Sequence, residues 1–321
     1  MPYVKYKDIN FRDSSLKVIN LVNSVVQEYH AEGYDLTLRQ VYYQLVARGY
    51  IPNNERSYKN LGNIINDGRL AGLIDWNSII DRTRNLRKNS HWSTPRSLIY
   101  SAASQFAIDL WSTQPYYVEV WVEKDALVGV VGQACSNLDI PYFSCRGYVS
   151  QSEMWSSAQR LIRARNYDYK DCIILHLGDH DPSGIDMTRD IQERLHLFGA
   201  DVEVIRIALT MEQVEEFSPP PNPAKLTDAR ASSYISMYGD ESWELDALEP
   251  RVITSLIETH ARRFMDSDKY YERIMEQNRL RQQLKDIHDY WEDAVYITDK
   301  YRQGTSTPIF EYDESDFYDN M

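Results

Sequence analysis

The segment CIILHLGDHDPSGID, residues 172–186, most constrains how this chain can fold. A short apolar run ends at Gly178, and Asp179, His180 and Asp181 follow it. This pattern is typical of a buried strand that ends at the carboxyl edge of an α/β sheet, where ligands bind. Two carboxylates one residue apart on a loop can place hard oxygen ligands on one divalent cation. An ordinary Asp-Pro-x-Gly turn explains the loop equally well.

A third acid, Glu123, follows a second predicted strand. Residues 117–122, YVEVWV, are rich in β-branched and aromatic residues, as strands are, and an apolar helical stretch begins at Ala126. Further strands are predicted at 140–145 and 202–208, and helices near 150–166 and 185–198. Alternating strands and helices predict an α/β fold with a parallel sheet of crossover units. We therefore expect Glu123, Asp179 and Asp181 to converge on one sheet edge.

The N-terminal region is predicted to be helical. Apolar residues at helical spacing predict an amphipathic helix over 14–30, and a Thr-x-x-Gln capping box at 37–40 predicts a second helix that stops at Gly49. Tyr42 falls on the apolar stripe of this second helix, which predicts a core position. Tyr43 falls off the stripe, on the same flank as Arg39, which predicts a surface position.

Tyr43 and Arg39 form a candidate nucleophile pair. A surface tyrosine can attack phosphorus if a neighbouring guanidinium stabilises the phenolate or the phosphate. The alternative is that Tyr43 only packs, which is the commoner role of a tyrosine on a helix.

Basic residues are concentrated before residue 110. Residues 1–110 hold 14 Lys and Arg against 10 Asp and Glu, although the whole chain has a net charge of −13. A helix predicted over 56–71 is followed by a short extended piece near 73–76. Phosphate contact and a solvated charged face both explain the basic residues. The candidate DNA-contacting residues are Arg56, Lys59, Arg69, Arg82, Arg84, Arg87 and Lys88.

Composition excludes several classes of protein. Hydrophobic residues make up 43% of the chain, which is enough for real cores, but no apolar run is long enough to span a membrane. The polar N-terminus does not resemble a secretory signal, and the three cysteines lack zinc-binding spacing. No Gly-x-x-x-x-Gly-Lys-(Ser/Thr) phosphate loop is present. We therefore expect a cytoplasmic protein with reduced thiols and no membrane partner.

Several short motifs resemble one family. VEKDA at 122–126, CRGY at 145–148 and GDHDPSGI at 178–185 are similar to the A subunit of topoisomerase VI and the related meiotic double-strand-break transesterases. LRQVYYQL at 38–45 resembles that family's Arg-(Asp/Glu)-hydrophobic-(Tyr/Phe)-Tyr motif, with Gln40 in place of the acid. The short, free-standing relatives called Mini-A proteins have the most similar layout.

The resemblance implies three regions. Residues 1–100 would form a winged-helix (CAP-like) DNA-binding domain, and residues 101–265 a Toprim domain with a mainly parallel sheet. Residues 266–321 would form a C-terminal helix and an acidic tail. The acids near residues 243–250 could join the metal shell, but a helix start also favours acids, and we expect this second role.

The resemblance also implies an activity. Tyr43, assisted by Arg39, would cleave double-stranded DNA by transesterification, as in a type IIB topoisomerase A subunit, and leave a 5′-phosphotyrosyl link. Magnesium, or manganese in its place, would be held by Glu123, Asp179 and Asp181. A homodimer would make the double-strand break at two composite sites, in each of which the tyrosine of one protomer works with the metal site of the other. An ATPase B-type subunit acting in trans is a further implied partner.

Two alternatives remain open. In the first, the chain is a Toprim endonuclease in which metal-activated water attacks and no covalent intermediate forms. In the second, it is a DNA-binding module with a vestigial site.

Overall fold

The computed structural model describes residues 3–80, 89–225 and 227–304. Contacts divide the chain into two units. One consists of Met1–Leu86 and Trp111–Tyr270, and the other of Arg87–Leu110 and Tyr271–Met321.

A four-stranded parallel sheet organises the first unit. Its strands are β1 (Tyr116–Val122), β2 (Tyr142–Ser144), β3 (Asp171–Leu177) and β4 (Val202–Ala208), in the order β2-β1-β3-β4. The predicted α/β class and the predicted parallel sheet are confirmed. β2 and β3 lie on opposite sides of β1, so the strand order reverses at β1, as at the sheet positions where α/β proteins bind ligands.

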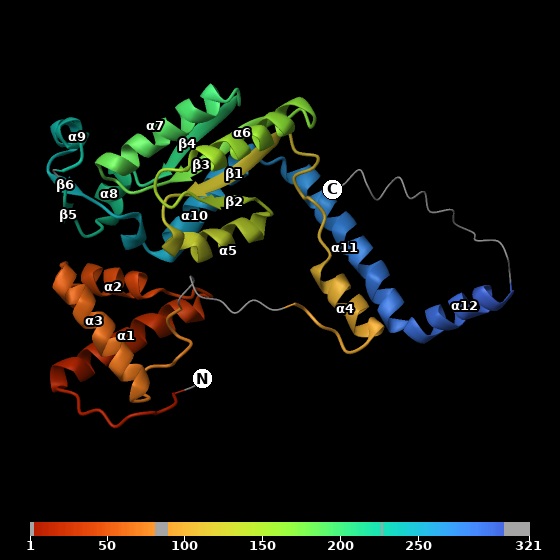
Figure 1. The fold of residues 1–321 in the computed structure, drawn as a ribbon, viewed down its shortest axis with the longest axis horizontal. Helices are drawn as coiled ribbons and strands as arrows, with labels where there is room; N and C mark the ends of the chain where they lie inside the picture. Colours follow the sequence, from red (N-terminus) through yellow and green to blue (C-terminus); the bar gives the residue numbers. More distant parts are fainter. Residues whose placement is uncertain (1–2, 81–88, 226, 305–321) are drawn as a thin grey trace. The chain divides into compact units, whose positions relative to one another are not determined.

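Helices cover both faces of the sheet (Figure 1). α6 (Gln151–Asn166) and α7 (Pro182–Leu197) pack on one face, and α5 (Val128–Leu138) and α10 (Pro250–Ala261) on the other. The α6–α7 face forms a buried core that includes Trp121, Met154 and Ile174. This three-layer packing agrees with the nearly continuous burial of β1 and β3, whose alternate residues are buried on both faces of the sheet.

Three helices at the N-terminus have their own core. α1 (Asp13–Ala31), α2 (Leu38–Ala47) and α3 (Glu55–Leu70) lie where the periodicity predicts them, and the Thr37–Gln40 capping box is present. In residues 3–80 we find no strand, only an isolated bridge between Leu36 and Ile79. The extended piece expected near 73–76 is therefore not a strand. Residues 3–80 thus lack the β-sheet that would form the wing of a winged-helix domain.

Short elements lie between β4 and α10. They are α8 (Met211–Phe217), β5 (Asn222–Pro223), α9 (Ala231–Tyr238), β6 (Glu241–Ser242) and the 3-10 turn Leu245–Ala247. β5 and β6 pair antiparallel. Two further 3-10 turns, Asp125–Leu127 and Arg262–Phe264, follow β1 and α10.

The second unit is built from α4 (Pro95–Gln105), most of α11 (Ser267–Asp289) and α12 (Trp291–Gly304). Arg281 Nε donates to the carbonyl of Phe106 at 2.6 Å, and Gln277 Oε1 accepts from Ile108 N at 3.0 Å. The sequence predicts one helical stretch over 267–301, but Tyr290 separates two helices there. No helix in the described part of the chain is long and apolar enough to cross a membrane.

Gly184 in the first turn of α7 is sterically required. A Cβ added there would lie 2.3 Å from the carbonyl oxygen of Asp179, far inside van der Waals contact. We expect Gly184→Ala to lower the free energy of unfolding by about 2 kcal/mol, as overpacking of a closed site does.

Chemical denaturation of wild type and Gly184→Ala measures the difference in the free energy of unfolding. Gly62→Ala in α3 is the control, since its nearest neighbour, Leu38, is at an ordinary 3.5 Å. That variant should be neutral or slightly stabilising, because alanine favours the helix. Equal stability of the two variants would contradict the assigned close approach.

Candidate active site

Glu123 and Gly178 leave the sheet side by side. Val122 and Leu177 are partners in the β1–β3 register, so the residues after them meet at the carboxyl edge. Glu123 Oε2 accepts a hydrogen bond of 2.8 Å from Asp179 N. The structure thus brings Glu123 and the Asp179 loop together, as the sequence predicts.

Asp181 begins α7. Its Oδ1 accepts from Gly184 N at 2.6 Å and from the Ser183 hydroxyl at 2.9 Å, which makes it the N-cap of the helix. The turn interpretation of this loop is therefore correct for one carboxylate oxygen. The other, Oδ2, accepts no hydrogen bond from the described residues, so Asp181 also keeps an oxygen for a ligand.

Asp179 is buried and holds two partners. Its Oδ1 accepts from Leu245 N at 2.8 Å, and its Oδ2 lies 2.9 Å from Lys124 Nζ. Lys124 directly follows Glu123. The end of β1 therefore supplies both an acid of the site and the cation that pairs with Asp179.

His180 joins this edge to a segment far along the chain. Its backbone forms an antiparallel bridge with Trp243, and its Nδ1 lies 2.7 Å from the Tyr234 hydroxyl. His180 is buried among aromatic rings, so its role is to pack in the core. The bridge places residues 244–246 beside Asp179.

Glu244 and Asp246 belong to the site, which the sequence offered only as the less favoured role. They stand at the start of the 3-10 turn Leu245–Ala247, as expected, but neither side chain caps it, and α10 begins only at Pro250. Lys124 Nζ contacts Glu244 Oε2 and lies 3.1 Å from Asp246 Oδ1.

Arg39 connects the N-terminal helices to the same acids. Its Nη2 lies 2.8 Å from Glu244 Oε2, and its Nε lies 2.7 Å from Asp246 Oδ2. The guanidinium carbon is 5.8 Å from the centroid of the Tyr43 ring. Arg39 and Tyr43 are therefore neighbours, as predicted, and both lie against the acidic edge.

Tyr43 is buried, with 5% of its surface exposed, so the predicted surface position is wrong. The predicted core position of Tyr42 is confirmed, and the Tyr42 hydroxyl donates to Asn53 Oδ1 at 3.0 Å. Tyr43 lies in the same buried cluster as Tyr42 and Leu45. The turn Leu245–Ala247 contacts α2 and contributes Ala247 to that cluster, which no local pattern reveals.

Burial and charge shift the pKa of several site groups. Burial and the nearby Asp179 carboxylate raise the pKa of Glu123 to about 7. Burial also raises the pKa of Asp179 against the opposing effect of Lys124. The pKa of Tyr43 is raised by burial and by Asp246, while Arg39 acts in the opposite direction. The resting phenol is therefore neutral at physiological pH.

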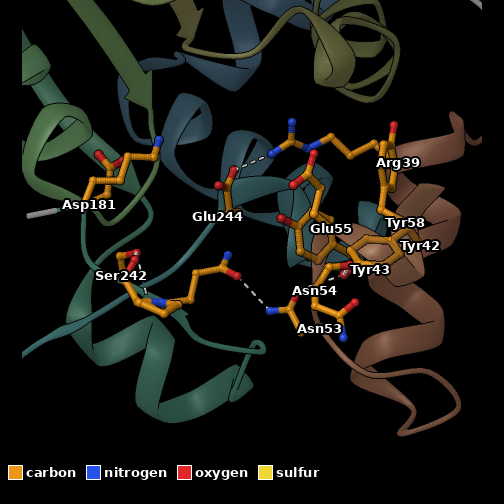
Figure 2. A pocket seen from close by; sticks show the side chains of 13 residues that line it. Arg39, Tyr42, Tyr43, Asn53, Asn54, Glu55, Tyr58, Asp181, Ser242 and Glu244 are labelled. Atoms are coloured by element: carbon orange, nitrogen blue, oxygen red, sulfur yellow. Dashed lines mark hydrogen bonds and ion pairs between the residues drawn. The ribbon is translucent and has the colours of Figure 1, made fainter. Parts of the chain in front are cut away.

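A pocket of about 280 Å³ brings the two halves of the site together in one chain (Figure 2). Tyr43 and Arg39 line one side, and Asp181 and Glu244 line the other. The remaining lining residues are Tyr42, Asn53, Asn54, Glu55, Tyr58, Asn222, Pro223, Lys225 and Ser242. Asn53 Nδ2 donates to Asn222 Oδ1 at 2.9 Å across this pocket.

No protein-family model and no curated protein matches this chain. Function must therefore be argued from the site itself.

Glu123, Asp179 and Asp181, which the sequence predicts as metal ligands, lie close together but are not arranged as a metal-binding site. Within the residues the structure describes, no three Asp, Glu, His or Cys side chains are grouped so that they could hold a metal ion. Glu123 Oε1 and Asp181 Oδ2 accept no hydrogen bond in this part of the chain, whereas both oxygens of Asp179 have partners.

The predicted DNA-contacting residues differ in their surroundings. Arg56 and Lys59 are exposed on α3, and Lys59 pairs with Glu55 at 2.6 Å. Arg69 is half-buried and donates to the carbonyls of Trp76 and Ile79, so it is occupied in holding residues 71–80 and is not an exposed phosphate contact. Arg82, Arg84, Arg87 and Lys88 lie outside the described residues.

Proposed function

We propose that this protein cleaves DNA by tyrosine transesterification with a divalent metal ion, in the manner of a topoisomerase VI A subunit of the short Mini-A type. The observation that carries the proposal is the pocket in which Tyr43 and Arg39 face Asp181 and Glu244. A phenol beside a guanidinium is a nucleophile with its charge stabiliser, and a carboxylate edge suits a cation that binds phosphate. The helical N-terminal region would be a winged-helix domain, and the sheet a Toprim domain.

In the proposed reaction the Tyr43 oxygen attacks a backbone phosphorus. The bond from phosphorus to the 3′ oxygen breaks, and the 5′ phosphate becomes joined to Tyr43. The phenol loses its proton to water, and the leaving 3′ oxygen takes up a proton from water. Arg39 would stabilise the negative charge that develops on the phosphate and on the phenolate.

The donor chemistry of the edge suits Mg²⁺ or Mn²⁺. Glu123 and Asp181 each offer an oxygen without a partner among the described residues, and Asp179 would be a third ligand if Lys124 released it. Carboxylate oxygens are the ligands these hard cations prefer. When bound, the metal would supply positive charge to the scissile phosphate.

DNA would approach along α3 and the basic run after it. Arg56 and Lys59 are exposed cations of α3. Double-strand cleavage by this family requires two copies, so we propose a homodimer acting on double-stranded DNA, with an ATPase subunit in trans as a further partner.

The test is to trap a covalent complex. Supercoiled DNA is incubated with the protein and Mg²⁺, the reaction is stopped with denaturant, and protein-linked 5′ ends are separated from free ends. We expect linked ends with wild type and none with EDTA. DNA that is never linked to protein under these conditions would contradict the proposal.

Hydrolysis by metal-activated water is the second candidate. The burial and the raised pKa of Tyr43 favour it, because both make the phenolate harder to form. This function predicts free DNA termini, and it predicts that the acids of the edge are needed while the Tyr43 hydroxyl is not.

A further inference from the structure

Glu244 occupies an anion position between two cations. Its Oε2 contacts both Arg39 Nη2, at 2.8 Å, and Lys124 Nζ. One carboxylate oxygen is therefore shared by a guanidinium and an ammonium group. Those are the two side chains that proteins use most to bind phosphate.

Asp246 contacts the same two cations from the buried side, away from the pocket. It contacts Arg39 Nε and Lys124 Nζ, and its side chain is 0% exposed, whereas that of Glu244 is 21% exposed. Glu244 lines the pocket and Asp246 does not. If the Glu244 carboxylate moved away, Asp246 would still hold Arg39 and Lys124 in place.

The position also has the right neighbours for the reaction. Arg39 lies beside the Tyr43 ring, and Lys124 contacts Asp179. An anion held between these two cations is placed between the candidate nucleophile and the acids of the sheet edge. Figure 2 shows the contact between Arg39 and Glu244 on the wall of this pocket.

We propose that the Glu244 carboxylate is an internal substitute for a DNA backbone phosphate and blocks the site until DNA displaces it. A phosphodiester and a carboxylate each carry one negative charge, so the exchange leaves the charge balance of Arg39, Lys124 and Asp246 unchanged. The resting pocket is thus closed to weak anions and opens to a polyanion. This inference rests on the proposed function, because it takes DNA as the substrate.

The experiment compares two variants that remove the same charge. Glu244→Gln takes away the competing anion, and Glu249→Gln removes a charge five residues later, where the carboxylate pairs with Arg251. Binding of a 30-base-pair duplex is measured in EDTA, so that no cleavage occurs. We expect Glu244→Gln to bind DNA about fivefold to tenfold more tightly than Glu249→Gln, the effect of losing a partly exposed competing ion pair.

Two further variants make the test specific. Glu244→Asp keeps the charge but shortens the side chain, so it should also bind DNA more tightly than wild type. In an Arg39→Ala background, Glu244→Gln should give a smaller gain, because only Lys124 remains to be freed. A cooperative thermal unfolding transition shows that a variant is folded. If Glu244→Gln does not fold, the comparison of Glu244→Asp with wild type is the test.

Three results would overturn the proposal: equal affinities for Glu244→Gln and Glu249→Gln, weaker binding by Glu244→Gln, or no DNA binding by any of the proteins. A tighter Glu244→Gln complex together with no covalent adduct in the cleavage assay has a different meaning. In that case the blocked phosphate position stands and the tyrosine mechanism fails.

Discussion

Replacing Tyr43 with phenylalanine is expected to reduce protein-linked DNA by roughly a thousandfold or more, the usual effect of removing a nucleophile. The change deletes only the hydroxyl oxygen. The ring remains and keeps its edge contact with Tyr42, whose centroid is 5.2 Å away. The fold and the Arg39 contact with the ring should therefore survive. The amount of adduct in a denaturing gel, at equal protein and Mg²⁺, measures the effect.

Tyr42→Phe is the matched control. This neighbouring tyrosine is equally buried, and its hydroxyl bonds Asn53 outside the group of acids. It should keep adduct formation within a few-fold of wild type. If Tyr43→Phe instead cleaves as fast as wild type and leaves free ends, water is the nucleophile, and the metal-dependent endonuclease is the better description.

The sheet could be predicted because its signals are local. β1 and β3 are short apolar runs that stop at Glu123 and Gly178, and each lies within a residue or two of its predicted position. Their parallel orientation then follows from the alternation of strands and helices, and the structure gives the register that pairs Val122 with Leu177. The meeting of Glu123 with Asp179 is a consequence of this register, so sequence alone predicted that half of the site.

The other half depends on contacts that no local pattern records. Glu244 and Asp246 reach the edge through the bridge between His180 and Trp243, which joins positions more than sixty residues apart. Nothing in either segment specifies that pairing. For the same reason the predicted exposure of Tyr43 was wrong: the turn Leu245–Ala247, which contacts its helix, comes some two hundred residues later.

Charge on a helix was an unreliable guide to a binding surface. Arg69 and Lys59 look equivalent in the sequence, yet Lys59 is exposed while Arg69 turns back to two backbone carbonyls. A long basic side chain can satisfy buried carbonyls as well as phosphates. Arg69 differs from Lys59 because the carbonyls that it binds belong to residues 71–80, after the helix. The sequence of the helix alone cannot show this contact.

The contribution of Glu123 to the stability of the protein is expected to fall as pH rises from about 4.5 to 7. Burial and Asp179 raise the pKa of Glu123 to about 7 in the folded state, against 4.5 in the unfolded chain. Between these values Glu123 is protonated more in the folded state than in the unfolded chain, so its contribution to the free energy of unfolding decreases with increasing pH. Below pH 4.5 the favourable contribution is complete, and above pH 7 it is lost.

Glu123→Gln should remove this contribution and make the protein roughly 2–3 kcal/mol more stable than wild type at pH 8. Denaturant unfolding in EDTA, at several pH values between 4.5 and 8, measures it. Glu203→Gln is the control, since Glu203 is exposed on β4, and it should retain the wild-type pH dependence. If Glu123→Gln is instead less stable than wild type at pH 8, the carboxylate is held by partners that favour its charge. The acidic edge would then be a satisfied structural cluster, and its excess negative charge could not be the reason it attracts a cation.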